Sequence, residues 1–223
     1  MQKLLIIDVG THKAEEVRLF AGDPSWTIRN RLRMVRAKRL AEIAETDRLS
    51  RQFRSIFDCR YILIEPVMHR ELIDFAGKEP CLLLNGVTSC DADGPVDLLM
   101  AEDSLGNSII PTKPNLTGEK KTTFNFNFPH LYEYLVETFA DRQIVIRMNA
   151  EGVEGPIIDY LAHAKVRPAL LAGSIGDIRK CFGEEAYAAA QATMERADIP
   201  FVYLTSHPRY WADGLRKIMD ILR

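Results

Sequence analysis

The sequence predicts an α/β protein in which helices cover both faces of a doubly wound, mostly parallel β-sheet. Short apolar runs alternate with segments of helical periodicity along most of the chain. The runs are nearly continuous in apolar character, which is typical of parallel strands with both faces buried. The chain has 223 residues, of which 47% are hydrophobic and 27% charged, so it can bury a large core. We therefore expect a single domain over residues 1–223.

Six apolar runs are expected as strands: Lys3–Asp8, Tyr61–Glu65, Cys81–Leu84, Gln143–Met148, Ala169–Leu171 and Phe201–Leu204. Helical periodicity predicts helices over Lys13–Phe20, His69–Ala76, Leu131–Ala140, Val153–His163, Ile175–Ala197 and Tyr210–Leu222. Strands and helices thus alternate, as they do in parallel sheets with crossover helices.

Two segments interrupt this alternation. Residues 28–57 are predicted to form a basic helical insertion, because Arg29–Arg39 contains six basic residues and no acidic one. This run is either a solvated helical face or a docking surface for an anionic acceptor, a lipid surface or nucleic acid. Residues 107–128 are rich in Pro, Gly, Asn, Thr and Lys, and predict a loop insertion that ends in a strand. A loop of this length in a compact domain is uncommon unless it binds something or is disordered.

Charge and hydropathy restrict the partners. The formal net charge is −2, so binding to nucleic acid would need a local basic patch. No stretch approaches the roughly 20 apolar residues of a membrane span, and the first apolar run is too short for a signal peptide, so we expect a cytoplasmic protein without a membrane span. The five histidines lack metal-ligand spacing, so no metal site is predicted.

The end of the first strand carries the first candidate site. The strand ends in Asp8, and Gly10 follows before the predicted helix. A glycine here allows a ligand to approach the backbone, and a helix N-terminus offers free N–H groups. The dinucleotide pattern G-x-G-x-x-G is absent, and an acid before the glycine suits a cationic or amine-bearing ligand. The alternative is a purely structural turn.

Two further strand ends carry acidic residues. Glu65 ends the second strand, where a carboxylate either accepts both hydroxyls of a ribose or is simply exposed. Glu151 and Glu154 follow the strand Gln143–Met148 and are three residues apart, so they can share one helical face. They are either candidate acid–base groups or acids stabilised by the helix dipole.

Together these motifs resemble the FkbM-type S-adenosylmethionine-dependent methyltransferases. The matching residues are Asp8-Val9-Gly10-Thr11-His12-Lys13, Glu65-Pro66, Asp103-Ser104-Leu105-Gly106-Asn107-Ser108 and Met148-x-x-Glu151-Gly152-Val153-Glu154. The resemblance covers about residues 3–205, and the E-G-V-E block is its most specific part. The helical insertion has no obvious counterpart in the family pattern.

The resemblance implies a class I methyltransferase fold, which is Rossmann-like, with S-adenosyl-L-methionine lying across the carboxyl ends of the first two strands. The resemblance implies a cofactor site at the ends of the first three strands. The expected cofactor-binding residues, including neighbours in the same turns, are Asp8, Gly10, Thr11, His12, Lys13, Glu65, Asn85 and Gly86. Family members mostly methylate hydroxyl groups, often on sugars or secondary metabolites. The expected acceptor is therefore a small molecule or a glycoside, and an anionic one if the basic insertion contacts it.

A hydroxyl acceptor must lose a proton, usually to a nearby Glu, Asp or His. Glu151 and Glu154 are the first candidates for this base, and His12 is the second. Asn149, the fourth candidate catalytic residue, stands where the family has Asp, and an amide cannot act as a base.

Two other positions depart from the family pattern: Ala14 replaces a glycine and Arg147 replaces a lysine. Ala14 and Asn149 favour an alternative function, a catalytically silent methyltransferase-like module for binding or assembly. A nucleic-acid methyltransferase is a third hypothesis, supported only by the arginine-rich insertion. The oligomeric state stays open.

Overall fold

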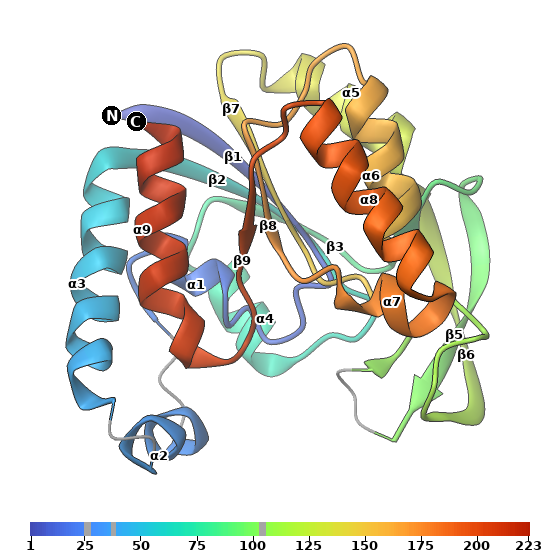
Figure 1. Ribbon diagram of the computed structural model, residues 1–223, viewed down its shortest axis with the longest axis horizontal. Helices are drawn as coiled ribbons and strands as arrows, with labels where there is room; N and C mark the ends of the chain where they lie inside the picture. Colours follow the sequence, from blue (N-terminus) through green and yellow to red (C-terminus); the bar gives the residue numbers. More distant parts are fainter. Residues whose placement is uncertain (25–27, 37–38, 103–105) are drawn as a thin grey trace.

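The computed structural model describes residues 1–24, 28–36, 39–102 and 106–223. Six parallel strands form its central sheet, in the order β3-β2-β1-β7-β8-β9 (Figure 1). Their bounds are β1 Gln2–Val9, β2 Phe57–Ile64, β3 Cys81–Leu84, β7 Gln143–Met148, β8 Leu170–Gly173 and β9 Phe201–Tyr203. The order reverses between β1 and β7, as in doubly wound folds. The predicted α/β architecture with a mostly parallel sheet is confirmed.

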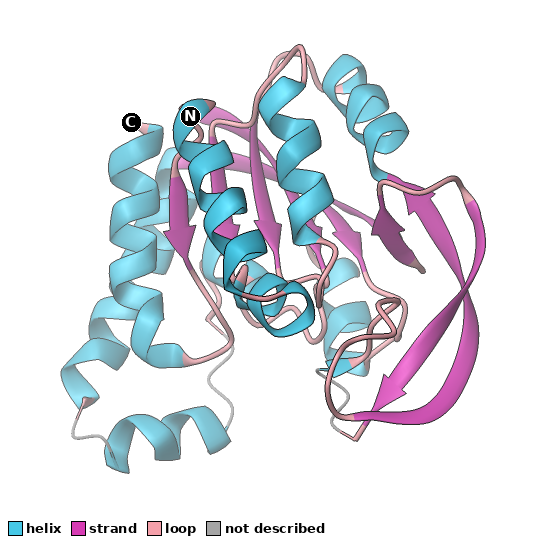
Figure 2. Cartoon of the chain, turned by 45° about the vertical axis from the view of Figure 1, so that its right-hand side comes forward, coloured by secondary structure: helices cyan, strands magenta, loops and turns pink. Residues whose placement is uncertain are grey.

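Helices cover both faces of this sheet (Figure 2). Leu4 and Ile6 of β1 belong to one core and Leu5 and Ile7 to the other, because successive strand residues point to opposite faces. The first core includes residues of α1 Val17–Phe20, α3 Leu40–Ile56, α4 Arg70–Ala76 and α9 Trp211–Leu222. The second includes residues of α5 Phe128–Thr138, α6 Glu154–His163, α7 Gly176–Phe182 and α8 Glu184–Arg196. A short 3-10 helix, η2 Pro208–Tyr210, precedes α9.

Two predicted helices differ from the observed ones for local reasons. The helix expected over Ile175–Ala197 is divided at Gly183, whose φ of 88° is incompatible with a continuous helix. The helix expected over Lys13–Phe20 is helical only from Val17, because His12 and Ala14 both have positive φ angles. The segment between β1 and α1 is therefore an irregular turn.

Within residues 28–56, the described residues form two helices, in agreement with the expected helical insertion. It contains α2 Ile28–Arg36 and α3, and α3 packs on the sheet through Leu49 and Phe53. The strand β2 begins at Phe57, four residues before the predicted start at Tyr61. Residues 37 and 38 of the basic run lie outside the described part of the chain, and α2 lies at the periphery of the molecule (Figure 1).

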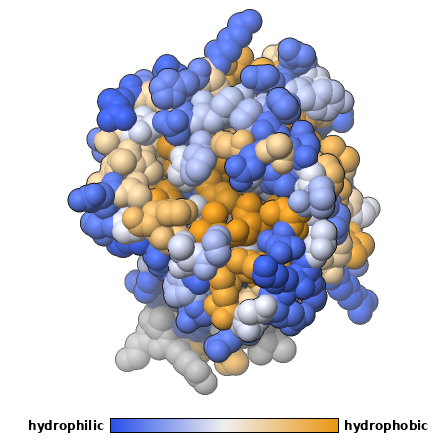
Figure 3. Space-filling view, turned by 90° about the vertical axis from the view of Figure 1, so that its right-hand side faces the viewer, coloured by the Kyte–Doolittle hydropathy of each residue, from blue (hydrophilic) through white to orange (hydrophobic). Residues whose placement is uncertain are grey.

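Residues 107–128, expected as a loop that ends in a strand, contain that strand as β6, which begins at Leu116. A second sheet of three strands, in the order β4-β6-β5, occupies this part of the molecule, with bounds β4 Val87–Ser89, β5 Gly94–Ala101 and β6 Leu116–Asn127. The strands β5 and β6 pair antiparallel from Gly94↔Asn125 to Ala101↔Leu116. The first half of β6 is polar and exposed and gave no strand signal, so the strand is longer than the alternating residues at its end indicate. On this side of the molecule, hydrophobic residues gather within a hydrophilic surround (Figure 3).

Among the described residues, no helix is both long and apolar enough to cross a lipid bilayer.

Candidate functional site

A pocket of about 620 Å³, counting its open mouth, lies at the carboxyl ends of β1, β2 and β7. The strand order reverses here, which is where open α/β sheets bind ligands. The wall opposite the main sheet comes from the second sheet and its connection, through Val87, Thr88, Leu98 and residues 107–109. Both sheets therefore build the pocket.

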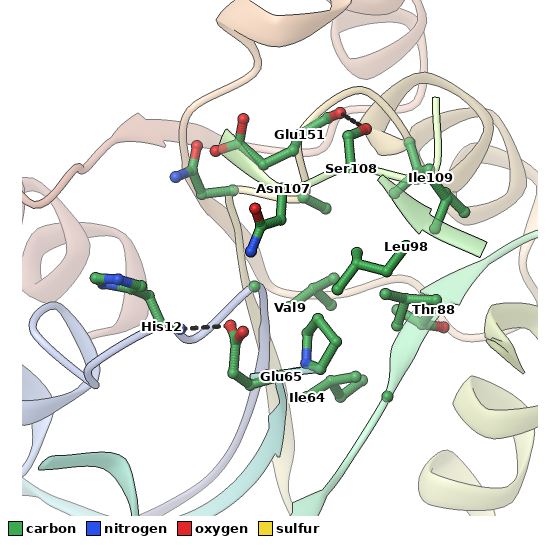
Figure 4. A pocket seen from close by; sticks show the side chains of 17 residues that line it. Val9, His12, Ile64, Glu65, Thr88, Leu98, Asn107, Ser108, Ile109 and Glu151 are labelled. Atoms are coloured by element: carbon green, nitrogen blue, oxygen red, sulfur yellow. Dashed lines mark hydrogen bonds between the residues drawn. The ribbon is translucent and has the colours of Figure 1, made fainter. Parts of the chain in front are cut away.

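The lining divides into a polar and an apolar part (Figure 4). Glu65, Asn107 and Glu151 bring carboxylate and amide groups to one side, whereas hydrocarbon surface from Ile64 and Leu98 dominates the other. The hydroxyls among the lining residues are engaged by the protein itself. Thr88 Oγ1 donates to the Phe126 carbonyl (2.6 Å), and Ser108 Oγ donates to the Glu151 carbonyl (2.6 Å). The pocket therefore suits a ligand with one apolar and one polar end.

Glu65 lies directly after β2 and points into the pocket (Figure 4). Its Oε2 accepts from the backbone N–H of His12 (2.7 Å), and its Oε1 accepts from that of Val67 (3.0 Å). Burial raises the pKa of Glu65, and the two backbone hydrogen bonds act against this rise. Each carboxylate oxygen has two lone pairs, so each keeps one for a ligand.

The turn after β1 supports Glu65 through its backbone. Gly10 has a φ of 74°, and a Cβ at this position would lie 2.2 Å from the Asn149 carbonyl oxygen. The glycine is therefore required by contact between two parts of the protein. The His12 ring points away from the other labelled pocket residues (Figure 4) and packs edge-on against His69, with ring centroids 4.5 Å apart. His12 lines the pocket and donates its backbone N–H to Glu65.

Asp8 lies outside the pocket lining, although it was predicted to contact the cofactor. Its Oδ1 accepts from Arg147 Nη1 (2.9 Å), while Arg147 Nη2 donates to Glu16 Oε1 (2.7 Å). Arg147 Nη1 also donates to the Gly10 carbonyl (2.7 Å). Burial raises the pKa of both carboxyl groups, that of Glu16 to about 7. Arg147 thus links Asp8 at the end of β1 to Gly10 and Glu16 in the turn that follows.

The two predicted acid–base candidates after β7 have different environments. Glu154 is fully buried and does not line the pocket, and it accepts hydrogen bonds from the N–H groups of Ala150 (2.7 Å) and Gly152 (2.8 Å). Burial raises the pKa of Glu154 to about 7. Glu151 lines the pocket and forms an ion pair with Lys113. Its φ of 58° turns the chain so that the two side chains diverge.

Of the other predicted site residues, two line the pocket and three do not. Gly86 and Asn149 line the pocket, and Asn149 N–H donates to the Val9 carbonyl (3.0 Å). Thr11, Lys13 and Asn85 do not line it: Thr11 is buried and its hydroxyl donates to the Asp8 carbonyl (3.0 Å), and Asn85 is exposed.

Sequence reasoning assigned no role to Asn107, Ser108 or Lys113, which lie in or beside the pocket. Asn107 and Ser108 belong to a stretch that matches the family pattern, which was the only available signal. Lys113 gave no signal, because its pairing with Glu151 depends on how the connection between β5 and β6 folds back.

Comparison of the chain with protein-family models, with curated proteins and with solved structures found no match in any of the three. The site is therefore interpreted from its own geometry.

Proposed function

We propose that this protein is an S-adenosylmethionine-dependent methyltransferase that methylates a hydroxyl group of a small molecule. The observation that carries the proposal is the Glu65 carboxylate, which faces a largely apolar pocket from the end of β2 at the switch point of the sheet. An acid at this position accepts hydrogen bonds from ribose hydroxyls in doubly wound folds. The apolar side of the pocket, with Ile64 and Leu98, suits the faces of a purine ring.

The charge of the lining favours a cationic nucleoside over a dinucleotide. Among the described residues that line the pocket, Glu65 and Glu151 are acidic and none is Lys or Arg. Because Lys113 balances the charge of Glu151, the Glu65 carboxylate decides the preference: it attracts a sulfonium and repels a diphosphate. The first helix after β1 begins only at Val17, beyond an irregular turn, so it does not provide the helix N-terminus that usually cradles a diphosphate.

The same lining modifies the expected acceptor. The Glu65 carboxylate repels an anionic acceptor, whereas the charge of Glu151 is balanced by Lys113, so we propose a neutral hydroxyl compound. The cofactor would supply an activated methyl group on a sulfonium. The protein would hold the ribose through Glu65, align the acceptor, and remove its proton through Glu151, the pocket-lining member of the predicted pair.

Titration calorimetry with S-adenosylhomocysteine tests the cofactor assignment. Glu65→Gln should weaken binding by about tenfold or more, because hydrogen bonds to a charged group are worth about 1.5–3 kcal/mol. Glu119→Gln is the matched control, since Glu119 is exposed on β6. ATP and NAD should bind more weakly than S-adenosylhomocysteine. A wild-type protein that gives no heat with S-adenosylhomocysteine at millimolar concentration would contradict the proposal.

A second candidate function is binding without transfer. It is favoured by Asn149, which cannot act as a base, and by the engagement of Glu151 with Lys113. Incubation with methyl-labelled S-adenosylmethionine and a panel of hydroxyl compounds distinguishes the two. Thermal stabilisation by the cofactor without any labelled product would support the binding module.

A further inference from the structure

Asn107 faces Glu65 across the pocket, with its amide nitrogen directed into the cavity (Figure 4). It comes from the connection between β5 and β6, so the pair joins the second sheet to the main one. We propose that Asn107 is a ligand-binding residue that, together with Glu65, recognises the vicinal hydroxyls of a ribonucleoside. This inference rests on the proposed function and specifies how its cofactor is selected.

The orientation of the Asn107 amide is fixed by hydrogen bonds to β5. Its neighbour Ser108 exchanges two backbone hydrogen bonds with Leu99, of 2.8 and 3.0 Å. The side-chain Oδ1 of Asn107 accepts from the backbone N–H of Ala101 (3.0 Å). A backbone N–H can only donate, so the oxygen must face Ala101 and the nitrogen must face the other way. Asn107 Nδ2 is therefore a hydrogen-bond donor with a fixed position that faces the pocket.

The two side chains present opposite hydrogen-bonding capacities. Glu65 is an acceptor whose oxygens each keep a lone pair, and Asn107 Nδ2 is a donor. A hydroxyl group can donate to the first and accept from the second. A phosphate would satisfy Asn107 but be repelled by Glu65, and an ammonium would satisfy Glu65 but not Asn107. A pair of neighbouring hydroxyls satisfies both residues, because each hydroxyl can donate and accept.

Asn107→Asp is the most informative variant, because an aspartate keeps the acceptor for the Ala101 N–H and replaces the donor that faces the pocket with a charged carboxylate oxygen. If Asn107 has only a structural role, this variant should bind like the wild type. If Asn107 binds the ligand, the variant should bind more weakly. We expect affinity for S-adenosylhomocysteine to fall at least tenfold in Asn107→Asp, measured by calorimetry, with a melting temperature close to that of the wild type. Asn115→Asp, at an exposed position, is the matched control and should bind normally.

The wild-type protein provides an independent test that needs no variant. Adenosine should displace S-adenosylhomocysteine better than 2′-deoxyadenosine or 3′-deoxyadenosine, by about tenfold or more. Both Glu65→Gln and Asn107→Asp should reduce this preference for the ribonucleoside. The double variant should lose less than the sum of the two single losses, because both residues contact the same hydroxyl groups.

The outcomes separate this inference from the proposed function. If S-adenosylhomocysteine binds and depends on Glu65 while Asn107→Asp changes nothing, the role of Asn107 is wrong and the proposed function stands. If adenosine binds with an Asn107-dependent preference over its deoxy analogues while S-adenosylhomocysteine does not bind, hydroxyl recognition stands and the methyltransferase proposal falls. If no nucleoside binds, both are overturned.

Discussion

Nη1 of Arg147 lies 2.9 Å from Oδ1 of Asp8, and the two residues are direct neighbours on the adjacent strands β7 and β1. Their side chains are 2% and 1% exposed. Arg147 also bonds Glu16 and the Gly10 carbonyl, so one guanidinium connects the sheet to the turn that supports Glu65. The turn that supports Glu65 therefore depends on a charge cluster whose side chains do not line the pocket.

Removal of the Arg147 charge should destabilise the protein strongly. Arg147→Met leaves Asp8 and Glu16 buried without a cation, which typically costs about 3–5 kcal/mol. We expect a loss of this size in the free energy of unfolding, measured by urea denaturation. Lys3→Met is the control, because the Lys3–Asp141 pair is more than half exposed and should contribute less than about 1 kcal/mol. Equal losses in the two variants would show that the buried cluster is not stabilising.

Glu16 should make stability depend on pH near neutrality. Burial raises its pKa from 4.5 to about 7, so between these values the folded state holds a proton that the unfolded state has lost. The resulting stabilisation is complete below about pH 4.5 and is lost as the pH rises through 7.

Urea midpoints measured between pH 5 and 8 should therefore fall more steeply in the wild type than in Glu16→Gln. Comparison with this variant separates Glu16 from other titrating groups, such as His69, whose pKa is lowered by burial. Parallel curves for the two proteins would mean that Glu16 does not titrate in this range.

Glu151 and Glu154 should differ in their effect on catalysis. Glu151→Gln should reduce methyl transfer about 100-fold or more, the lower end for loss of a general base. Its melting temperature should also fall, because the buried Lys113 loses its ion-pair partner. Glu154→Gln should lower the melting temperature, because a glutamine oxygen replaces only one of the two acceptors for the N–H groups of Ala150 and Gly152. Turnover by Glu151→Gln at the wild-type rate would remove Glu151 from the chemistry.

Gly10 should tolerate no side chain, for reasons of space as well as conformation. Gly10 and Gly118 have similar φ angles, 74° and 85°, but a Cβ on Gly118 meets nothing within 4 Å. Gly118→Ala therefore measures backbone strain alone, about 1–2 kcal/mol. Gly10→Ala adds an overlap with the Asn149 carbonyl and should cost about 2 kcal/mol more in denaturant unfolding. If the two variants lose the same stability, the turn can move away from Asn149.

The sequence by itself determined the strand segments of the main sheet, its parallel arrangement and the strand ends at which Gly10, Glu65 and Glu151 lie. Continuous apolar runs and their spacing carry this information locally, because a buried parallel strand must be apolar on both faces. The positive φ angles of Gly183 and Ala14 were not evident from the sequence. The helix boundaries predicted near these two residues were therefore misplaced.

Only the tertiary structure decided which charged groups face the pocket. Asp8 and Glu154 have the same chemistry as Glu65 and Glu151, yet Asp8 is paired with Arg147 and Glu154 with backbone N–H groups. Asn107 lies in the connection between β5 and β6, and the sequence pattern did not show how these two strands pair or where their connection lies. The direction of a carboxylate can depend on partners that are 50 to 140 residues away in the chain, as for Glu65 with His12 and Asp8 with Arg147. Local periodicity in the sequence cannot predict such distant partners.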